Sequence, residues 1–356
     1  MKMNDSKTET LQTPGESSSD IEISSSHEPQ LPSKPVEGGR EAWLTTIGGC
    51  IALAGTFGYV SSFGVFQDYY TRHGTATSSD ISWIGSVQLF LFIALGLPAG
   101  KLVDKGYFKH VLLAGSLIYL VSLFMLSLAH VDQYYQLFLS QGVGMGIGGG
   151  LVYLPSMAVQ GHHWKTKRAL IMGIVISGTS LGGIFYPIML NQLLHDSVGF
   201  AWGVRASAFL TLGLLIIANL IMKDRLPPKK NEQQVKERED TPLSLTPQRS
   251  PSYEVITDYP FLLMLTGTFL IILGLFFAYF YLQLFAALHN ISAGLTFHQL
   301  TIQNAASIPG RILPGLLGDK FGTLNIFIIA SIATGLLVYS MFGAGSELCF
   351  HYVHLL

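Results

Sequence analysis

The chain has 356 residues, of which 49% are hydrophobic, only 12% are charged and 38 are glycine. This composition is typical of a membrane protein rather than of the two soluble domains that the length alone would suggest. The net charge of −1 comes with no basic patch interleaved with aromatic residues, which excludes a nucleic-acid partner. Cys50 and Cys349 offer neither a disulfide framework nor a metal site. No soluble segment assembles a nucleophile, a base and an orienting group, so we expect neither an enzyme nor a cofactor.

Polar stretches divide the chain. Residues 1–41, rich in Ser, Glu, Pro and Thr, predict a disordered cytosolic tail, and residues 223–258 predict a cytosolic linker. Between them, residues 42–222 predict a six-helix transmembrane bundle. Residues 259–345 predict a partial bundle of three helices, followed by a short tail over 346–356. Since a bilayer core needs about 20 apolar residues per helix, the predicted spans are 42–67, 82–103, 109–129, 135–159, 169–191, 201–222, 259–287, 297–318 and 324–344.

The distribution of positive charge predicts the orientation of these spans. With the N-terminus in the cytosol, 18 of the 21 Lys and Arg residues fall in cytosolic segments. Only Arg72 and Arg205 fall outside, and Arg311 lies within the eighth span. The excess of positive charge on cytosolic loops therefore predicts a cytosolic N-terminus.

A short charged motif between the second and third spans is repeated in the second half of the chain. Its three shared residue types recur 215 positions later, and the two copies are Gly100, Asp104, Lys105 and Gly315, Asp319, Lys320. Glycine lets two helices approach closely, and an aspartate there can lie beside a helix N-terminus. Six spans, a charged linker and this repeated hinge resemble the major facilitator superfamily. The resemblance implies an all-α membrane protein with that superfamily's fold.

Three further motifs resemble the monocarboxylate transporter family. Residues 163–178, HWKTKRALIMGIVISG, follow that family's pattern at the start of the fifth span. The lead-in EGGREAW at 37–43 and the run NAASIPGRILPGLLGDKFG at 304–322 also match, the latter as in fungal members. The matching residues of the first motif are Lys167, Arg168, Leu170, Gly173 and Gly178. Whole members carry twelve spans, so the resemblance implies that the last three helices are missing here.

Arg311 is the leading candidate for a substrate contact. A guanidinium inside an apolar span costs on the order of 2.5–3.5 kcal/mol, so such residues usually serve function. Asn304, Ser307 and Arg311 recur at i, i+3 and i+7, which predicts one polar face lining a water-filled path. An arginine there can bind a carboxylate through two parallel hydrogen bonds. The alternative is a structural arginine that snorkels or caps a neighbouring helix.

The resemblance to monocarboxylate transporters also has gaps. That family's mammalian pattern places an aspartate where this chain has Ser307 and a lysine where it has Ser61. A proton is a candidate coupling ion, with Asp68 or His195 as the titratable group. Polar and aromatic residues of the spans, among them Tyr59 and Tyr279, are candidate contacts for a larger neutral or aromatic substrate.

Three functions follow from these features. The first is a secondary transporter of a small organic anion, such as a monocarboxylate, working by alternating access. The second is an efflux transporter of a fungal secondary metabolite, and the third is a truncated membrane protein that does not transport. For a transporter we expect a small-molecule substrate, a multi-pass position in the plasma membrane and a monomer.

Overall fold

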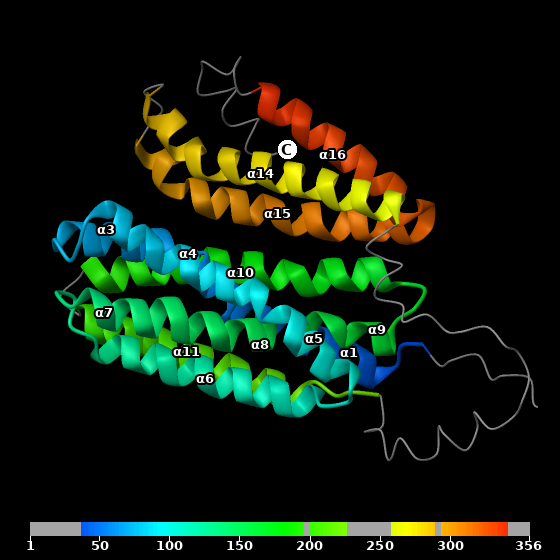
Figure 1. Ribbon diagram of the computed structural model, residues 1–356, viewed down its shortest axis with the longest axis horizontal. Helices are drawn as coiled ribbons and strands as arrows, with labels where there is room; N and C mark the ends of the chain where they lie inside the picture. Colours follow the sequence, from blue (N-terminus) through cyan, green and yellow to red (C-terminus); the bar gives the residue numbers. More distant parts are fainter. Residues whose placement is uncertain (1–36, 196–198, 226–257, 289–292, 341–356) are drawn as a thin grey trace, which may run out of the picture. The chain divides into compact units, whose positions relative to one another are not determined.

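The computed structural model describes residues 37–195, 199–225, 258–288 and 293–340 (Figure 1). For His195, Leu273, 275–288 and 293–300 the description is limited to the backbone. Nearly all of the predicted tail 1–41, most of the linker 223–258 and the whole tail 346–356 lie outside these residues. All regular secondary structure in the described part is helical, in agreement with the all-α prediction.

Each of the six spans predicted within residues 42–222 is a run of helix. Several of these runs are interrupted by short breaks. The elements are α1 (Arg40–Gly55), α2 (Phe57–Val60), α3 (Phe63–Arg72), α4 (Ser78–Ala94), α5 (Gly96–Asp104), α6 (Phe108–Leu128), α7 (Tyr134–Leu137), the π-helix η1 (Phe138–Gly144), α8 (Met145–Ala158), α9 (Gln160–His163), α10 (Arg168–His195) and α11 (Gly199–Ile221).

The three spans predicted in the second half are also helical. They are α14 (Tyr259–Leu288), α15 (Ala293–Phe321) and α16 (Thr323–Ser340). Within the part of the chain that was described, seven helical stretches are long and apolar enough to cross a membrane. These are the six of the first bundle and α16. The α15 helix carries Arg311, Asp319 and Lys320, and its sequence is correspondingly less apolar.

The breaks within the spans have local causes. The Thr56 hydroxyl donates to the carbonyl of Ala52 at 2.7 Å, where it competes with the backbone ladder between α1 and α2. Pro98 has no N–H, so the carbonyl of Ala94, four residues earlier, lacks its helical donor. The α4 helix ends at Ala94 for this reason. In the fourth span the wider turns of η1 place Gln141 where its amide oxygen accepts from the Tyr70 hydroxyl at 2.8 Å.

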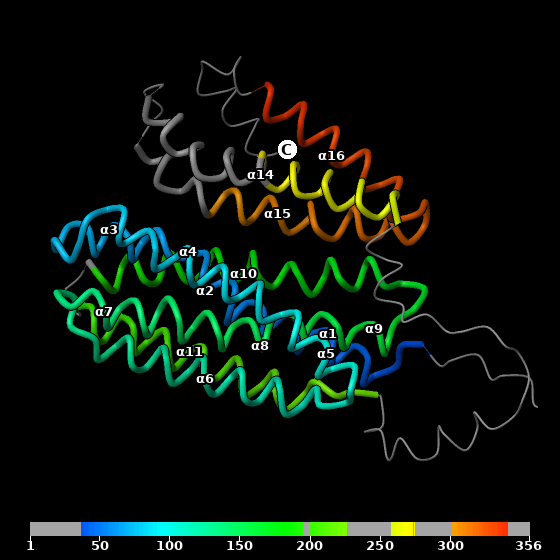
Figure 2. The backbone as a smooth tube through the Cα atoms, viewed as in Figure 1, coloured from blue at the N-terminus to red at the C-terminus, as the bar shows by residue number. Residues whose placement is uncertain are grey.

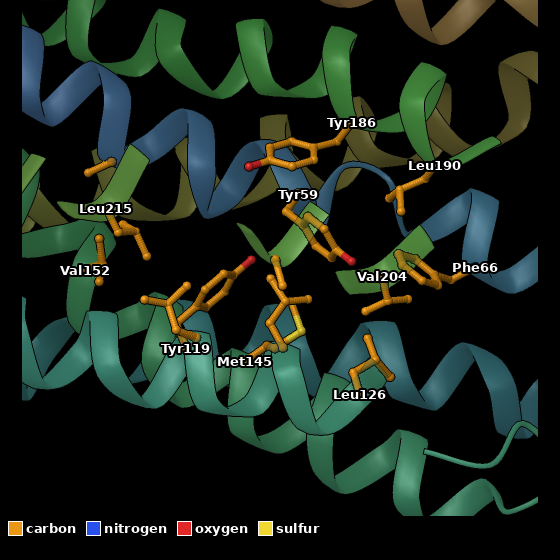
Figure 3. Close-up of a cluster of buried hydrophobic side chains, with 14 of the residues drawn as sticks. Tyr59, Phe66, Tyr119, Leu126, Met145, Val152, Tyr186, Leu190, Val204 and Leu215 are labelled. Atoms are coloured by element: carbon orange, nitrogen blue, oxygen red, sulfur yellow. The ribbon is translucent and has the colours of Figure 1, made fainter. Parts of the chain in front are cut away.

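The core of the first bundle combines aromatic rings with closely packed glycines (Figure 3). Tyr59, Tyr119 and Tyr186 are at most 1% exposed. A Cβ on Gly148 would lie 2.4 Å from the Tyr119 nitrogen, and one on Gly149 would lie 2.0 Å from the Phe92 ring. The glycines of α8 therefore set the distance between this helix and its neighbours α4 and α6.

The α10 helix packs against α1 on one side and α15 on the other. Figure 2 shows α15 alongside α10, with α14 and α16 next to α15. On the α1 side, a Cβ on Gly178 would lie 2.0 Å from the Cys50 carbonyl oxygen, and one on Gly182 would lie 2.2 Å from that of Ala54. The predicted motif glycine Gly178 is thus a helix contact, and α10 is the element through which the two halves of the chain meet.

Candidate functional site

The predicted polar face of α15 lies against α10. The Arg311 guanidinium donates through Nη1 to the carbonyl of Ile176 at 2.8 Å and also to the Thr179 hydroxyl. Ser307 Oγ lies 2.5 Å from Ser180 Oγ. All three predicted residues, Asn304 included, are half-buried. The structure therefore brings them together as predicted, but at a contact between two helices.

Asn304 continues this interface toward the other end of α10. Its side-chain nitrogen donates to the Gly183 carbonyl at 3.4 Å. A Cβ on Gly183 would lie 2.6 Å from the Asn304 side-chain oxygen, so a larger residue there would have to displace this amide. The pair Ser180 and Ser307 lies between two other contacts of α15 with α10. One is at Gly183, and the other is at Ile176 and Thr179. We call this set of contacts the polar seam.

The motif glycine Gly173 faces α15, unlike Gly178. A Cβ there would lie 2.3 Å from the Arg311 carbonyl oxygen. The hinge residue Gly315 makes the reciprocal contact, since its Cβ would lie 2.6 Å from the Ala169 carbonyl oxygen. These two glycines let the backbones of α10 and α15 approach closely on the side nearer the start of α10.

The two copies of the hinge motif differ in what they contact. The Asp319 carboxylate accepts from the N–H groups of Ala169 at 2.9 Å and Leu170 at 2.8 Å, at the first turn of α10. This is the place beside a helix N-terminus that we expected for either aspartate. Asp104 makes no hydrogen bond or ion pair with the residues that the structure describes, and a Cβ on Gly100 would meet no atom within 4 Å.

The basic residues of the motifs lie at the surface. Lys105, Lys167, Arg168 and Lys320 are all exposed. The Lys320 ammonium lies 5.4 Å from the centre of the Phe321 ring. Their placement at loop ends agrees with the charge asymmetry of the sequence, and none of them reaches the polar seam.

Two further candidates lie away from the seam. Tyr59 is 1% exposed, and its hydroxyl lies 3.2 Å from Ser207 Oγ inside the first bundle. Its ring meets Tyr186 edge to face at 5.0 Å between centres. Tyr279 belongs to α14, and its side chain lies outside the described part of the chain. A substrate contact for either tyrosine remains a prediction.

The sequence motifs at 37–43 and 163–178 contact each other. The Glu37 carboxylate accepts from the N–H groups of Lys165 at 3.1 Å and Thr166 at 3.0 Å, and from the Thr166 hydroxyl. That hydroxyl bond is the main reason why the pKa of Glu37 is lowered. The Trp164 indole donates to Thr46 at 3.2 Å. The lead-in segment is therefore fastened to the loop before α10, which the separate motifs did not reveal.

Sequence reasoning missed the half of the seam that α10 provides. Thr179 and Ser180 are 3% and 0% exposed and supply hydroxyls to α15. The available signal was the run of small and polar residues SGTSLGG at 177–183 inside an otherwise apolar helix. Its hydroxyls gave no indication of which neighbouring helix they would face.

The geometry defines a multi-pass helical membrane protein whose two halves meet along α10 and α15, where the charged side chain of Arg311 bonds to α10. A family model described as the Major Facilitator Superfamily matches residues 45–355. The chain belongs to that superfamily.

Several curated fungal proteins are similar to this chain. The Aspyridones efflux protein apdF of Emericella nidulans is 39% identical over 317 residues, which cover 88% of this chain and 61% of that protein. The Agnestins efflux protein AgnL12 of Paecilomyces divaricatus is 34% identical over 297 residues, covering 83% and 64%. The MFS-type transporter pytF of Aspergillus terreus is 37% identical over 291 residues, covering 81% and 93%. This chain thus spans less than two thirds of the two named efflux proteins.

Proposed function

We propose that this protein acts as an efflux transporter of a fungal secondary metabolite, working by alternating access. The names of two relatives, both called efflux proteins, support this reading over the transport of a small monocarboxylate. The sequence supports it as well, because Ser307 and Ser61 stand where the mammalian monocarboxylate pattern has charged residues. We further propose a plasma-membrane location with a cytosolic N-terminus.

The polar seam is the observation that carries the proposal. Alternating access requires contacts between the two halves that form in one state and separate in another. The bonds from Arg311 and Ser307 to α10 are such contacts, since they are few, polar and made across the boundary between the halves. A substrate that competes for these groups would couple its own binding to their separation.

Arg311 also gives the substrate a chemical character. Its guanidinium lies within the predicted eighth span, where it favours a ligand that carries negative charge. We therefore propose that the exported compound has an acidic group, such as a carboxylate, a phenolate or an enolate. A proton is the proposed coupling ion.

The test is export from a fungal host that makes the metabolite. Deleting the gene should raise the ratio of intracellular to extracellular product at least severalfold, and restoring the full chain should reverse this change. Arg311→Ala should fail to restore export at unchanged membrane abundance. The matched control is Arg205→Ala, which removes a guanidinium that lies over the Trp202 ring on α11.

Two outcomes would overturn the proposal. An unchanged product ratio after gene deletion would exclude efflux as the role of this protein. Normal export by Arg311→Ala would exclude the seam arginine from the transport cycle.

A further inference from the structure

The tyrosines of the first bundle differ in how deeply they are buried. Four of them are at most 1% exposed, and each has its hydroxyl hydrogen-bonded inside the bundle. The partners of Tyr59, Tyr70, Tyr119 and Tyr186 are Ser207 at 3.2 Å, Gln141 at 2.8 Å, the Thr56 carbonyl at 3.2 Å and Thr211 at 2.7 Å, respectively. This is the usual arrangement for buried hydroxyls.

Tyr153 of α8 is different. Its side chain is half-buried, and its hydroxyl makes no hydrogen bond with the residues that the structure describes. The hydroxyl therefore keeps its capacity to hydrogen-bond an incoming group. A half-buried ring with an accessible hydroxyl is suited to contact a ligand.

Tyr153 belongs to a cluster of three rings from three helices. We call Phe57, Phe92 and Tyr153 the ring cluster. Their centres are 5.5 Å apart for Phe57 and Phe92, 5.5 Å for Phe57 and Tyr153, and 5.4 Å for Phe92 and Tyr153. Phe92 is fully buried and lies directly over Gly149, while Phe57 is half-buried like Tyr153. The rings of Phe57 and Tyr153 are thus partly exposed, and the buried ring of Phe92 packs against both.

The ring cluster lies near the polar seam. The guanidinium of Arg311 is within electrostatic range of the Tyr153 side chain. The packing of α2 on α10 agrees with this proximity. A Cβ on Gly58, the residue after Phe57, would lie 2.5 Å from the Gly182 Cα, and the next residue of α10, Gly183, contacts Asn304 of the polar seam.

This inference rests on the proposed efflux function. We propose that Phe57 and Tyr153, supported by Phe92, bind a flat aromatic ring system. The acidic group of that ligand is bound by Arg311 and the Tyr153 hydroxyl. The substrate class is then a planar, conjugated organic acid. Ring faces and edges attract other aromatic rings beyond simple burial, whereas a saturated skeleton gains only the burial. Arg311 selects the charge, and the ring cluster selects the planar shape.

The experiment measures binding to the purified full chain in lipid nanodiscs. Three probes distinguish the requirement for an acidic group from the requirement for a planar ring. The compound 2-naphthoate is planar and acidic, decahydro-2-naphthoate is acidic but saturated, and 2-naphthylmethanol is planar but neutral. We expect 2-naphthoate to bind about threefold to tenfold more tightly than its saturated counterpart, the range that an aromatic pair provides. It should also bind more tightly than the neutral probe.

Variants assign these preferences to residues. Phe57→Leu and Tyr153→Leu should abolish the preference for the aromatic acid, while Phe57→Tyr, which keeps a ring, should retain it. Tyr153→Phe should weaken 2-naphthoate about tenfold, the usual effect of losing a hydrogen bond to a charged group. The matched control is Phe90→Leu, on the same helix as Phe92 but 68% exposed, which should leave the preference unchanged.

The outcomes separate this inference from the proposed function. Equal affinity for the aromatic and saturated acids, or no binding of any probe, would overturn the ring cluster as a site even if the gene deletion blocks efflux. A clear aromatic preference that is lost in Phe57→Leu would support the site even if the deletion leaves efflux unchanged.

Discussion

The carboxylate of Asp319 accepts a hydrogen bond at 2.8 Å from the N–H of Leu170, 149 positions earlier in the chain. This bond joins the end of α15 to the first turn of α10, and a second bond to Ala169 reinforces it. A helix N-terminus has N–H groups without helical partners and a partial positive charge, so an aspartate from another helix satisfies both needs. The contact fastens one end of the interface along which the polar seam runs.

Removing this carboxylate should weaken the α10 and α15 contact. We expect Asp319→Ala to lower the free energy of unfolding by about 1 kcal/mol, the usual loss when a helix cap is removed. Thermal unfolding in detergent would show this as a lower Tm. Asp104→Ala is the matched control, since it removes the repeat's other aspartate, which has no hydrogen bond in the described structure. Equal losses in the two variants would contradict the capping role.

Gly173 should tolerate no larger side chain. A Cβ there would lie 2.3 Å from the Arg311 backbone oxygen, so Gly173→Ala must push α10 and α15 apart. We expect a cost of about 1–3 kcal/mol, typical of overpacking. The readout is the yield of a disulfide between cysteines introduced at Ser180 and Ser307, which should fall. Gly310→Ala on α15, where a Cβ meets nothing within 4 Å, should leave that yield unchanged.

The Tyr70 hydroxyl should stabilise the π-helical segment of the fourth span. Tyr70→Phe removes the donor to the buried Gln141 amide oxygen and leaves it without that bond. Such a loss costs about 1–3 kcal/mol. Thermal unfolding should show a lower Tm for Tyr70→Phe than for Tyr135→Phe. The second variant removes a hydroxyl from a residue that is 60% exposed. Indistinguishable melting curves would contradict this role.

Glu37 should contribute stability that depends on pH. Its folded pKa lies below the ordinary value of 4.5, mainly because the Thr166 hydroxyl donates to its charged form. A lowered folded pKa means that the contribution is fully present above the unfolded value and is lost as the pH falls through the folded value.

The measurement compares Tm for the parent chain and Glu37→Gln between pH 7 and pH 3. The difference should be largest near pH 7, should begin to fall near the ordinary pKa of 4.5 and should vanish only below the lowered folded pKa. Asp132→Asn, which changes an exposed loop carboxylate with no hydrogen bond in the described structure, is the control. A difference that grows as the pH falls would show that Glu37 acts in some other way.

Much of the fold followed from local features of the chain. Apolar runs of sufficient length predicted helix in all nine places where the described chain has long helical runs, since a helix satisfies the backbone polar groups of a single apolar segment by itself. The prediction that three helices are missing stays a prediction. The monocarboxylate family remains a resemblance, and the named relatives favour the efflux alternative.

The candidate site was only half predictable. Arg311, Ser307 and Asn304 stood out because polar residues are rare in spans, and Asp319 stood out because its motif is repeated. Their partners Thr179 and Ser180 did not, because small hydroxyl residues are common in membrane helices and usually bond their own backbone. The sequence singled out Tyr59 and not Tyr153, yet the Tyr59 hydroxyl is bonded in the core and the Tyr153 hydroxyl makes no hydrogen bond with the described residues.

The sequence by itself determined where the long apolar helices lie, the superfamily it resembles and which rare polar residues they carry. These properties depend on runs of neighbouring residues and on short motifs. Only the tertiary structure decided that α10 lies between α1 and α15, and that the Tyr59 hydroxyl is bonded in the core whereas the Tyr153 hydroxyl makes no hydrogen bond with the described residues. In spans that are apolar on every side, no periodicity marks the packed face. That face is set by partners more than 100 positions away, through close glycine contacts and hydrogen bonds across helices.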